Sequence, residues 1–244
     1  MSYKDYGKQD WLKVLGITDE KVPELLVIEG SNLMQRRLAE RQKLLTNPTT
    51  IRYPNIIAGE ANGKRVAYAC AYGAPFAAEL VHVLCASGTR KVVLIGCCGG
   101  LQRSIKMGDV IIPDSIHGEE GVSSEYLGGF HDVEATPALV KEIADQCTRR
   151  NLRYHIGPFV TFEAVIAETR EHVRRWGSSG YLGVDMEAAA IFAVAKYFGA
   201  DRAAMLPAAD LVVEGRTFLD TVEEDERLNL EKARNSMAEI AFGL

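Results

Sequence analysis

The chain has 244 residues, of which 47% are hydrophobic and 25% are charged, and its formal net charge is −5 at pH 7. We expect one globular domain over residues 1–244, and the mild charge without a long Lys/Arg cluster excludes nucleic acid as the expected partner and favours a small molecule. No apolar run is long enough to span a bilayer and residues 1–10 are polar, so we expect a cytoplasmic protein without a membrane contact.

Apolar, β-rich runs recur along the chain, each followed by a helix-like or Gly-rich segment. Strands buried on both faces of a sheet have such runs, so the order predicts an α/β fold with helices covering a mostly parallel or mixed sheet. The expected strands are residues 25–29, 65–71, 91–96, 109–113, 154–161, 182–184 and 203–206. Apolar residues at helical spacing predict helices at residues 9–15, 35–45, 75–87, 137–149, 168–176, 186–198 and 223–242.

The strand expected at residues 91–96 runs into the small-residue turn 96–100 (GCCGG). Small residues let backbone N–H groups approach a ligand at the carboxyl end of a strand. The segment has neither the G-x-G-x-x-G spacing of a dinucleotide site nor the Lys-Ser/Thr of a P-loop, so by itself it favours a simple tight turn.

Residues 117–134 are polar and Gly-rich, and they form a long connection for a compact domain. We expect a loop here, either a lid or binding loop or a disordered excursion. Tyr126 and Phe130 would be unusual in a purely solvating segment.

Two acids, Asp185 and Glu187, flank Met186 where an apolar segment turns into an Ala-rich helix. Small residues on the following turns let that helix lie close to a sheet, so packing would hold the acids towards a cleft. A later strand-like run ends in a third carboxylate, Asp210. The alternative interpretation is that these acids are favourable charges or caps at helix N-termini.

The five cysteines are an odd number without the spacing of a disulfide framework or a metal knuckle, and the five histidines form no HxxxH or HExxH pair. We predict reduced, buried thiols and no metal. The paired Cys97 and Cys98 leave a cysteine-dependent transferase as an open alternative.

Taken in order, residues 108–113, the Asp185-Met186-Glu187 segment and residues 203–210 resemble the nucleoside phosphorylase superfamily. That superfamily includes hexameric purine nucleoside phosphorylases, uridine phosphorylases and methylthioadenosine nucleosidase, and the resemblance runs from about residue 25 to the last helix. It implies a three-layer αβα fold with a twisted central mixed sheet. It further implies an enzyme of nucleoside metabolism that acts on a small-molecule nucleoside, forms a homodimer or hexamer, and needs no cofactor beyond phosphate as co-substrate.

The resemblance also implies roles around the sugar and the base. Glu187 would accept hydrogen bonds from ribose hydroxyls, with Met186 packed on the sugar and Tyr72 lining it. Asp210 would protonate purine N7, which makes the departing base neutral and stabilises an oxocarbenium-like sugar.

The base end departs from the family pattern. The phenylalanine that stacks on the base in the family is absent. Val165 stands near its position, and Phe162 and Glu163 are close to it in the sequence. The Gln-x-Arg pair that reads uracil lacks its glutamine in residues 166–170. The resemblance therefore favours a purine-type base over uracil.

The phosphate end departs further. The implied phosphate or nucleophile region comprises Gly30, Gly96, Cys97 and Arg52, the last lent by a neighbouring subunit. Met34 and Leu94 replace the arginines of the two family phosphate loops, and Cys97 replaces the serine. Guanidinium contacts to a phosphate are charge-assisted bonds worth roughly 1.5–3 kcal/mol each, so their loss predicts an atypical site.

Three hypotheses follow. Arg36 or Arg37 could restore the phosphate site beside Arg52, giving phosphorolysis to free base and ribose 1-phosphate. Water could instead be the nucleophile, although Leu33 and Met34 stand where the nucleosidase branch has its glutamate. A non-catalytic nucleoside-binding protein is the third hypothesis.

Overall fold

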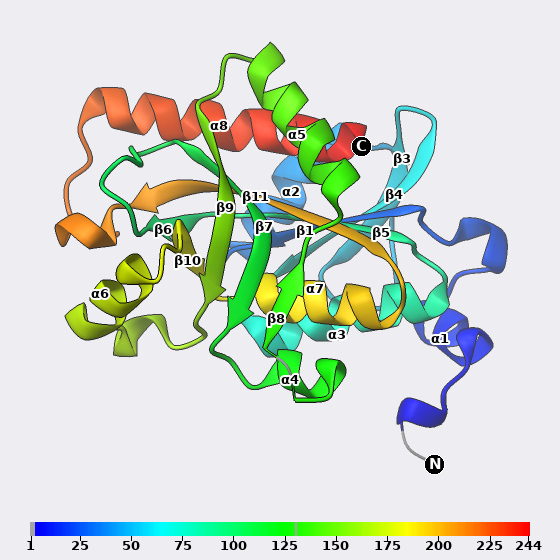
Figure 1. Ribbon diagram of the computed structural model, residues 1–244. Coiled ribbons are helices and arrows are strands. Elements are labelled where there is room, and N and C mark those ends of the chain that lie inside the picture. The colour runs from blue at the N-terminus through cyan, green and yellow to red at the C-terminus, as the bar shows by residue number, and fades with distance from the viewer. Residues whose placement is uncertain (1–2, 130) are drawn as a thin grey trace.

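A mixed sheet lies at the centre of the molecule in a computed structural model, which describes residues 3–129 and 131–244 (Figure 1). Its strands are β1 (Leu25–Gly30), β2 (Thr46–Thr50), β3 (Ile56–Ala61), β4 (Lys64–Ala71), β5 (Lys91–Ile95), β6 (Cys98–Gly100), β7 (Val110–Gly118), β8 (Asp132–Glu134), β9 (Tyr154–Thr161), β10 (Gly183–Asp185) and β11 (Asp201–Asp210). They are ordered β2-β3-β4-β1-β5-β11-β6-β10-β9-β7-β8. The neighbours β4, β1, β5 and β11 run parallel, so their carboxyl ends meet at one edge.

Helices cover both faces of this sheet. They are α1 (Lys8–Leu15), α2 (Met34–Arg41), α3 (Ala74–Ser87), α4 (Val122–Leu127), α5 (Pro137–Arg149), α6 (Arg170–Ser178), α7 (Ala188–Tyr197) and α8 (Glu224–Gly243). In Figure 1, α3, α4 and α7 lie below the sheet, and α5 and α8 lie above it. The predicted α/β fold with helices on both sides of a mixed sheet is confirmed.

The long strand β11 curls the sheet back on itself. Its first half, up to Met205, pairs with β5, whereas Leu206 pairs with Ile111 of the antiparallel β7 and Ala208 pairs with β6. A register shift follows between Ala208 and Asp210. The bend brings Asp210, the last residue of β11, close to the carboxyl ends of β1 and β5.

Four strands were missing from the prediction: β2, β3, β6 and β8. The edge strand β2 is fully exposed and contains a proline, so it has no apolar pattern. It pairs with β3, which forms a hairpin with β4. The strands β6 and β8 have only three residues each, below the length at which a period can be seen. The strands predicted at 109–113 and 203–206 were too short, because β7 and β11 continue beyond their apolar cores.

The prediction of a loop over residues 117–134 was wrong. The segment contains the end of β7, helix α4 and strand β8, with Phe130 outside the described residues. Glu120 is buried and accepts the backbone N–H groups of Val122 and Ser123, which caps the start of α4. On the same helix, the Tyr126 hydroxyl lies 3.0 Å from Nδ1 of His82 on α3.

Three predicted helices also changed their limits. The helix at 35–45 ends at Arg41 and continues as a 3₁₀ turn, Gln42–Leu44. The helix at 186–198 begins at Ala188, because Glu187 is its N-cap. The helix at 168–176 begins at Arg170 and follows a 3₁₀ turn, η4 (Val165–Ala167).

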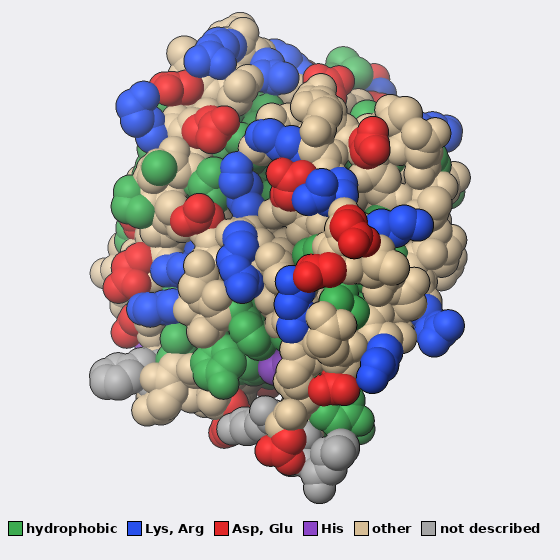
Figure 2. Space-filling view, turned by 90° about the vertical axis from the view of Figure 1, so that its right-hand side faces the viewer, with side chains coloured by type: hydrophobic (Ala, Val, Ile, Leu, Met, Phe, Trp, Pro, Cys, Tyr) green, Lys and Arg blue, Asp and Glu red, His purple; other side chains and the backbone are tan. Residues whose placement is uncertain are grey.

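No helix in the described parts of the chain has both the length and the apolar character that crossing a membrane requires. On the face shown in Figure 2, Lys and Arg side chains are interspersed with Asp and Glu. That face therefore presents mixed charge rather than a single basic surface.

The tight packing of β10 makes a stability prediction. A Cβ at Gly183 would lie 2.7 Å from Cε2 of Phe159 and 2.8 Å from Cδ1 of Ile111, both in the buried core. Gly183→Ala should lower the free energy of unfolding by about 1–3 kcal/mol through overpacking. Gly121→Ala is the matched control, since a Cβ there meets nothing within 4 Å. Urea unfolding that gives both variants the same stability would contradict the packing argument.

Candidate functional site

A cavity of about 440 Å³ opens at the edge where β1, β5 and β11 end. In parallel sheets the carboxyl ends of the strands are the usual place for a ligand, because backbone groups and the loops that follow converge there. The predicted site residues that line it are Gly30, Tyr72, Gly96, Cys97, Phe162, Val165, Met186, Glu187 and Asp210. They come from segments far apart in the chain.

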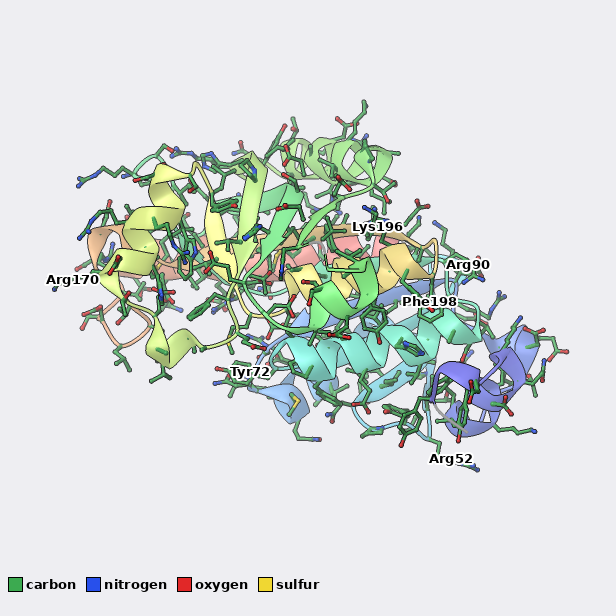
Figure 3. The ribbon with its side chains drawn as sticks, turned by 60° about the horizontal axis from the view of Figure 1, so that its bottom comes forward. Arg52, Tyr72, Arg90, Arg170, Lys196 and Phe198 are labelled. Atoms are coloured by element: carbon green, nitrogen blue, oxygen red, sulfur yellow. The ribbon has the colours of Figure 1, made fainter. Side chains whose placement is uncertain are left out.

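Two predicted site residues do not line this cavity. Glu163 is exposed on the turn after β9 and is not part of the wall. Arg52 packs against Gly16 at the end of α1, with its Cβ 3.4 Å from the position that a Cβ on Gly16 would take. In Figure 3, Arg52 lies beside α1, whereas Tyr72 lies at the opposite end of α3. Any role of Arg52 in such a site therefore requires a second copy of the chain.

The junction of β10 and α7 holds a buried carboxylate, Asp185. The Thr161 hydroxyl donates to Asp185 Oδ1 at 2.7 Å, and Asp185 Oδ2 accepts the backbone N–H of Ala188 at 2.9 Å. The same Thr161 oxygen accepts the N–H of Ala189. Asp185 and Thr161 thus bond the first turn of α7, whose N–H groups have no partner within the helix, and they fix the backbone on which Glu187 sits.

Glu187 is buried at the cavity wall. Its Oε1 accepts the N–H of Gly73 at 2.7 Å, and Gly73 has φ +90°, a conformation that favours glycine. A Cβ on Gly30 would lie 2.8 Å from Glu187 Oε2, so a larger residue there would displace this carboxyl group. Burial raises the pKa of Glu187, and burial followed by the charge of Glu187 raises the pKa of Asp185. The carboxyl of Glu187 is held as a hydrogen-bonding group at the cavity surface.

Asp210 lies at the end of β11 and lines the same cavity as the β10–α7 junction. Burial raises its pKa to about 6, and the nearby positive charge of Arg234 limits the rise. A carboxyl group with this pKa carries a proton over part of the physiological range, so it can act as a hydrogen-bond donor or a general acid.

Arg234 is a cavity residue that sequence reasoning missed. It lies on α8, and its Nε donates to Cys97 Sγ at 3.1 Å. Among the residues that the structure describes, no carboxylate forms an ion pair with it. Helix α8 also carries Arg227, so the sequence contains no signal that marks Arg234 as the arginine facing a cavity.

Arg37 also lines the cavity, whereas Arg36 does not. The Nε of Arg37 lies 3.2 Å from Oε1 of the buried Glu29, and the Nη1 of Arg37 donates to Glu40 at 2.9 Å. Glu29 in turn accepts Nε of Arg41 at 3.0 Å and the buried Tyr68 hydroxyl at 2.8 Å. The positive charge of Arg37 is therefore shared with two carboxylates, so Arg234 is the less compensated cation.

The thiols of the Gly-rich turn do not favour nucleophilic chemistry. Burial raises the pKa of Cys97 even beside Arg234, and burial raises the pKa of Cys98 well above its ordinary value. Both thiols therefore stay protonated, whereas the thiolate is the reactive form. In the described residues, no group of three or more His, Cys, Asp or Glu side chains is arranged to bind a metal ion.

Comparison with known proteins gives consistent results. The model of the Phosphorylase superfamily matches residues 31–243. The DeoD-type purine nucleoside phosphorylase of Bacillus cytotoxicus is 26% identical over 91% of this chain and 93% of its own length. That of Caldanaerobacter subterraneus subsp. tengcongensis is 26% identical over 86% of this chain and 96% of its own length. A crystal structure of uridine phosphorylase from Vibrio fischeri covers 98% of both chains with a TM-score of 0.79 and 21% identity, a likeness in fold.

Proposed function

Because this chain belongs to the phosphorylase superfamily, we propose that it cleaves the N-glycosidic bond of a purine nucleoside by phosphorolysis, releasing the free base and ribose 1-phosphate. The observation that carries this proposal is the meeting of Asp210 and Glu187 in one cavity, the first with a raised pKa and the second fixed by Gly73. The two relatives compared by sequence are purine nucleoside phosphorylases, which supports the choice of base, and the uridine phosphorylase structure is a likeness in fold.

The residues then act in a defined order. Glu187 accepts hydrogen bonds from the ribose hydroxyls, and Met186 and Tyr72 pack around the sugar. The bond between C1′ and N9 breaks, and its electron pair goes to the base. Protonated Asp210 donates to N7, so the base leaves without a negative charge, and a phosphate oxygen forms the new bond to C1′.

A bound phosphate needs positively charged side chains, and this chain lacks the arginines of the two phosphate loops of the family. We propose that Arg234 supplies the main guanidinium and Arg37 a second, partly compensated one, beside Gly30, Gly96 and Cys97. This differs from the expectation that Arg36 or Arg37 would restore the site beside Arg52, because Arg234 was not part of it. Arg52 of a second subunit would complete it, in keeping with the proposed homodimer or hexamer.

The first experiment separates phosphorolysis from its alternatives. Purified protein is incubated with adenosine, inosine, guanosine and uridine, with and without phosphate, and the base and sugar products are followed by chromatography. We expect purine release that requires phosphate and yields ribose 1-phosphate. Release to free ribose without phosphate would make the protein a hydrolytic nucleosidase, and tight binding without any product would make it a nucleoside-binding protein.

The role of Asp210 predicts a pH dependence. Since the pKa of Asp210 is raised to about 6, the protonated acid is present below that pH and is lost above it. The kcat/KM should therefore fall as pH rises through about 6, and Asp210→Asn should lower kcat by about 10²–10⁴-fold and remove this limb. Asp145→Asn, at an exposed position on α5, is the control. Near-normal turnover by the Asp210 variant would exclude it as the acid.

The role of Arg234 predicts a selective defect. Arg234→Gln should raise the KM for phosphate by about 10–100-fold, the value of one charge-assisted contact, and change the KM for the nucleoside much less. Without the positive charge of Arg234 the pKa of Asp210 should rise, so the fall of kcat/KM with pH should occur at higher pH. Arg227→Gln is the control, since Arg227 is on the same helix and pairs with exposed glutamates. An unchanged KM for phosphate would show that the anion lies elsewhere.

A further inference from the structure

A second cavity, of about 910 Å³, adjoins the proposed active site. The two cavities share Glu168, Val212 and Thr217 in their walls, so they meet beside Asp210, two residues before Val212. The second cavity lies between α6, the turn after β6, and the 3₁₀ turn η5 (Val212–Glu214). None of the roles proposed so far uses it.

Three arginines border this second cavity: Arg103, Arg170 and Arg174. Within residues 3–129 and 131–244, none of their side chains forms a hydrogen bond or an ion pair. Their neighbours behave differently, because Arg175 pairs with Glu119 at 2.7 Å and Arg216 pairs with Glu226 at 2.6 Å. The guanidinium groups around the cavity are therefore available to an anion.

The elements that carry these arginines are fixed relative to one another. The amide of Gln102 donates to the carbonyls of Gly177 at 3.0 Å and Tyr181 at 2.8 Å, which ties the turn of Arg103 to the end of α6. Arg170 and Arg174 are four residues apart on α6 and so share one helix face. In Figure 3, Arg170 lies at an edge of the molecule well away from Arg52 and Arg90.

Two carboxylates also border this second cavity, Glu168 and Glu214. Glu214 is exposed and lies near Arg216. Glu168 stands at the junction of the two cavities, where burial and then the charge of Asp210 raise its pKa. Three guanidiniums against two carboxylates leave one excess positive charge, which matches the single charge of one carboxylate.

The position of Asp210 orients a purine towards this junction. N7 and the substituent at C6 share one edge of the purine ring, so a base whose N7 faces Asp210 directs its C6 substituent to the same side. Glu168, which lines both cavities, would then accept the N–H of an exocyclic amine there. A substituent on that amine would extend into the cavity bordered by arginines.

We infer that the second cavity receives a carboxylate carried on the exocyclic C6 amine of the purine nucleoside, bound by Arg103, Arg170 and Arg174. This inference rests on the proposed function, because it uses the contact between Asp210 and N7. It makes the preferred substrate a purine nucleoside with an acidic arm rather than an unsubstituted nucleoside.

The test measures binding directly. Wild-type protein in phosphate-free buffer is titrated calorimetrically with a series of N6-(carboxyalkyl)adenosines of increasing arm length and with their methyl esters, which are larger by one methyl group and carry no charge. At the best arm length the acid should bind about tenfold more tightly than its ester, the worth of one charge-assisted contact. Arg103→Gln/Arg174→Gln should abolish this preference, and Arg149→Gln, on the exposed end of α5, should keep it.

The outcomes are distinct. Equal affinity for acid and ester at every arm length, or a preference that survives in the double variant, overturns the inference. Binding of free propionate that depends on the same arginines, with acid and ester still equal, makes the cavity an independent anion site and also overturns it. Phosphate-dependent turnover of adenosine and of the best N6-(carboxyalkyl)adenosine by the wild type is followed in parallel, because the absence of both counts against the proposed function and not against the arginine cavity alone. Urea unfolding of the double variant checks that its fold is intact.

Discussion

The buried carboxylates at the start of α7 constrain the rest of the site. A carboxylate is costly to bury unless it is hydrogen-bonded, and the structure meets this cost with Thr161, with the first N–H groups of α7 and with Gly73. The end of β1 also approaches Glu187 closely, and a side chain at position 30 would displace its carboxyl group. The position of Glu187 is therefore set by residues at the ends of β1, β4 and β9, and not by the β10–α7 junction alone.

The same principle explains the balance of charge at the other end of the cavity. Glu29 lies buried under the cavity and is bonded by Arg41 and Tyr68, with Arg37 beside it. This network uses much of the positive charge that α2 brings to the site. Helix α8, which comes from the far end of the chain, contributes the less compensated Arg234. An anion site of this kind depends on the packing of two helices that are distant in sequence.

The sequence predicted the fold class because that class depends on strong local signals, whereas most of the residues expected at the cavity came from the family resemblance. Apolar runs mark β1, β4 and β5, and the acids Asp185 and Asp210 stand at the ends of β10 and β11. Arg234 and the pairing of Arg37 could not be predicted, because which face of a helix meets a cavity is decided by tertiary packing. The hairpin strand β2, with an exposed proline, and the short β6 and β8 likewise form through partners rather than through their own residues.

The walls of the cavity are drawn from Glu29 at one extreme to Met237 at the other, and they meet only when the whole sheet and α8 are in place. A ligand that fills this space has no comparable site on the unfolded chain. Its binding energy is therefore added to the stability of the fold, by RT ln(1 + [L]/Kd) for free ligand at concentration [L]. The Tm of this protein should consequently rise with any compound that binds in the cavity, whether or not that compound is turned over.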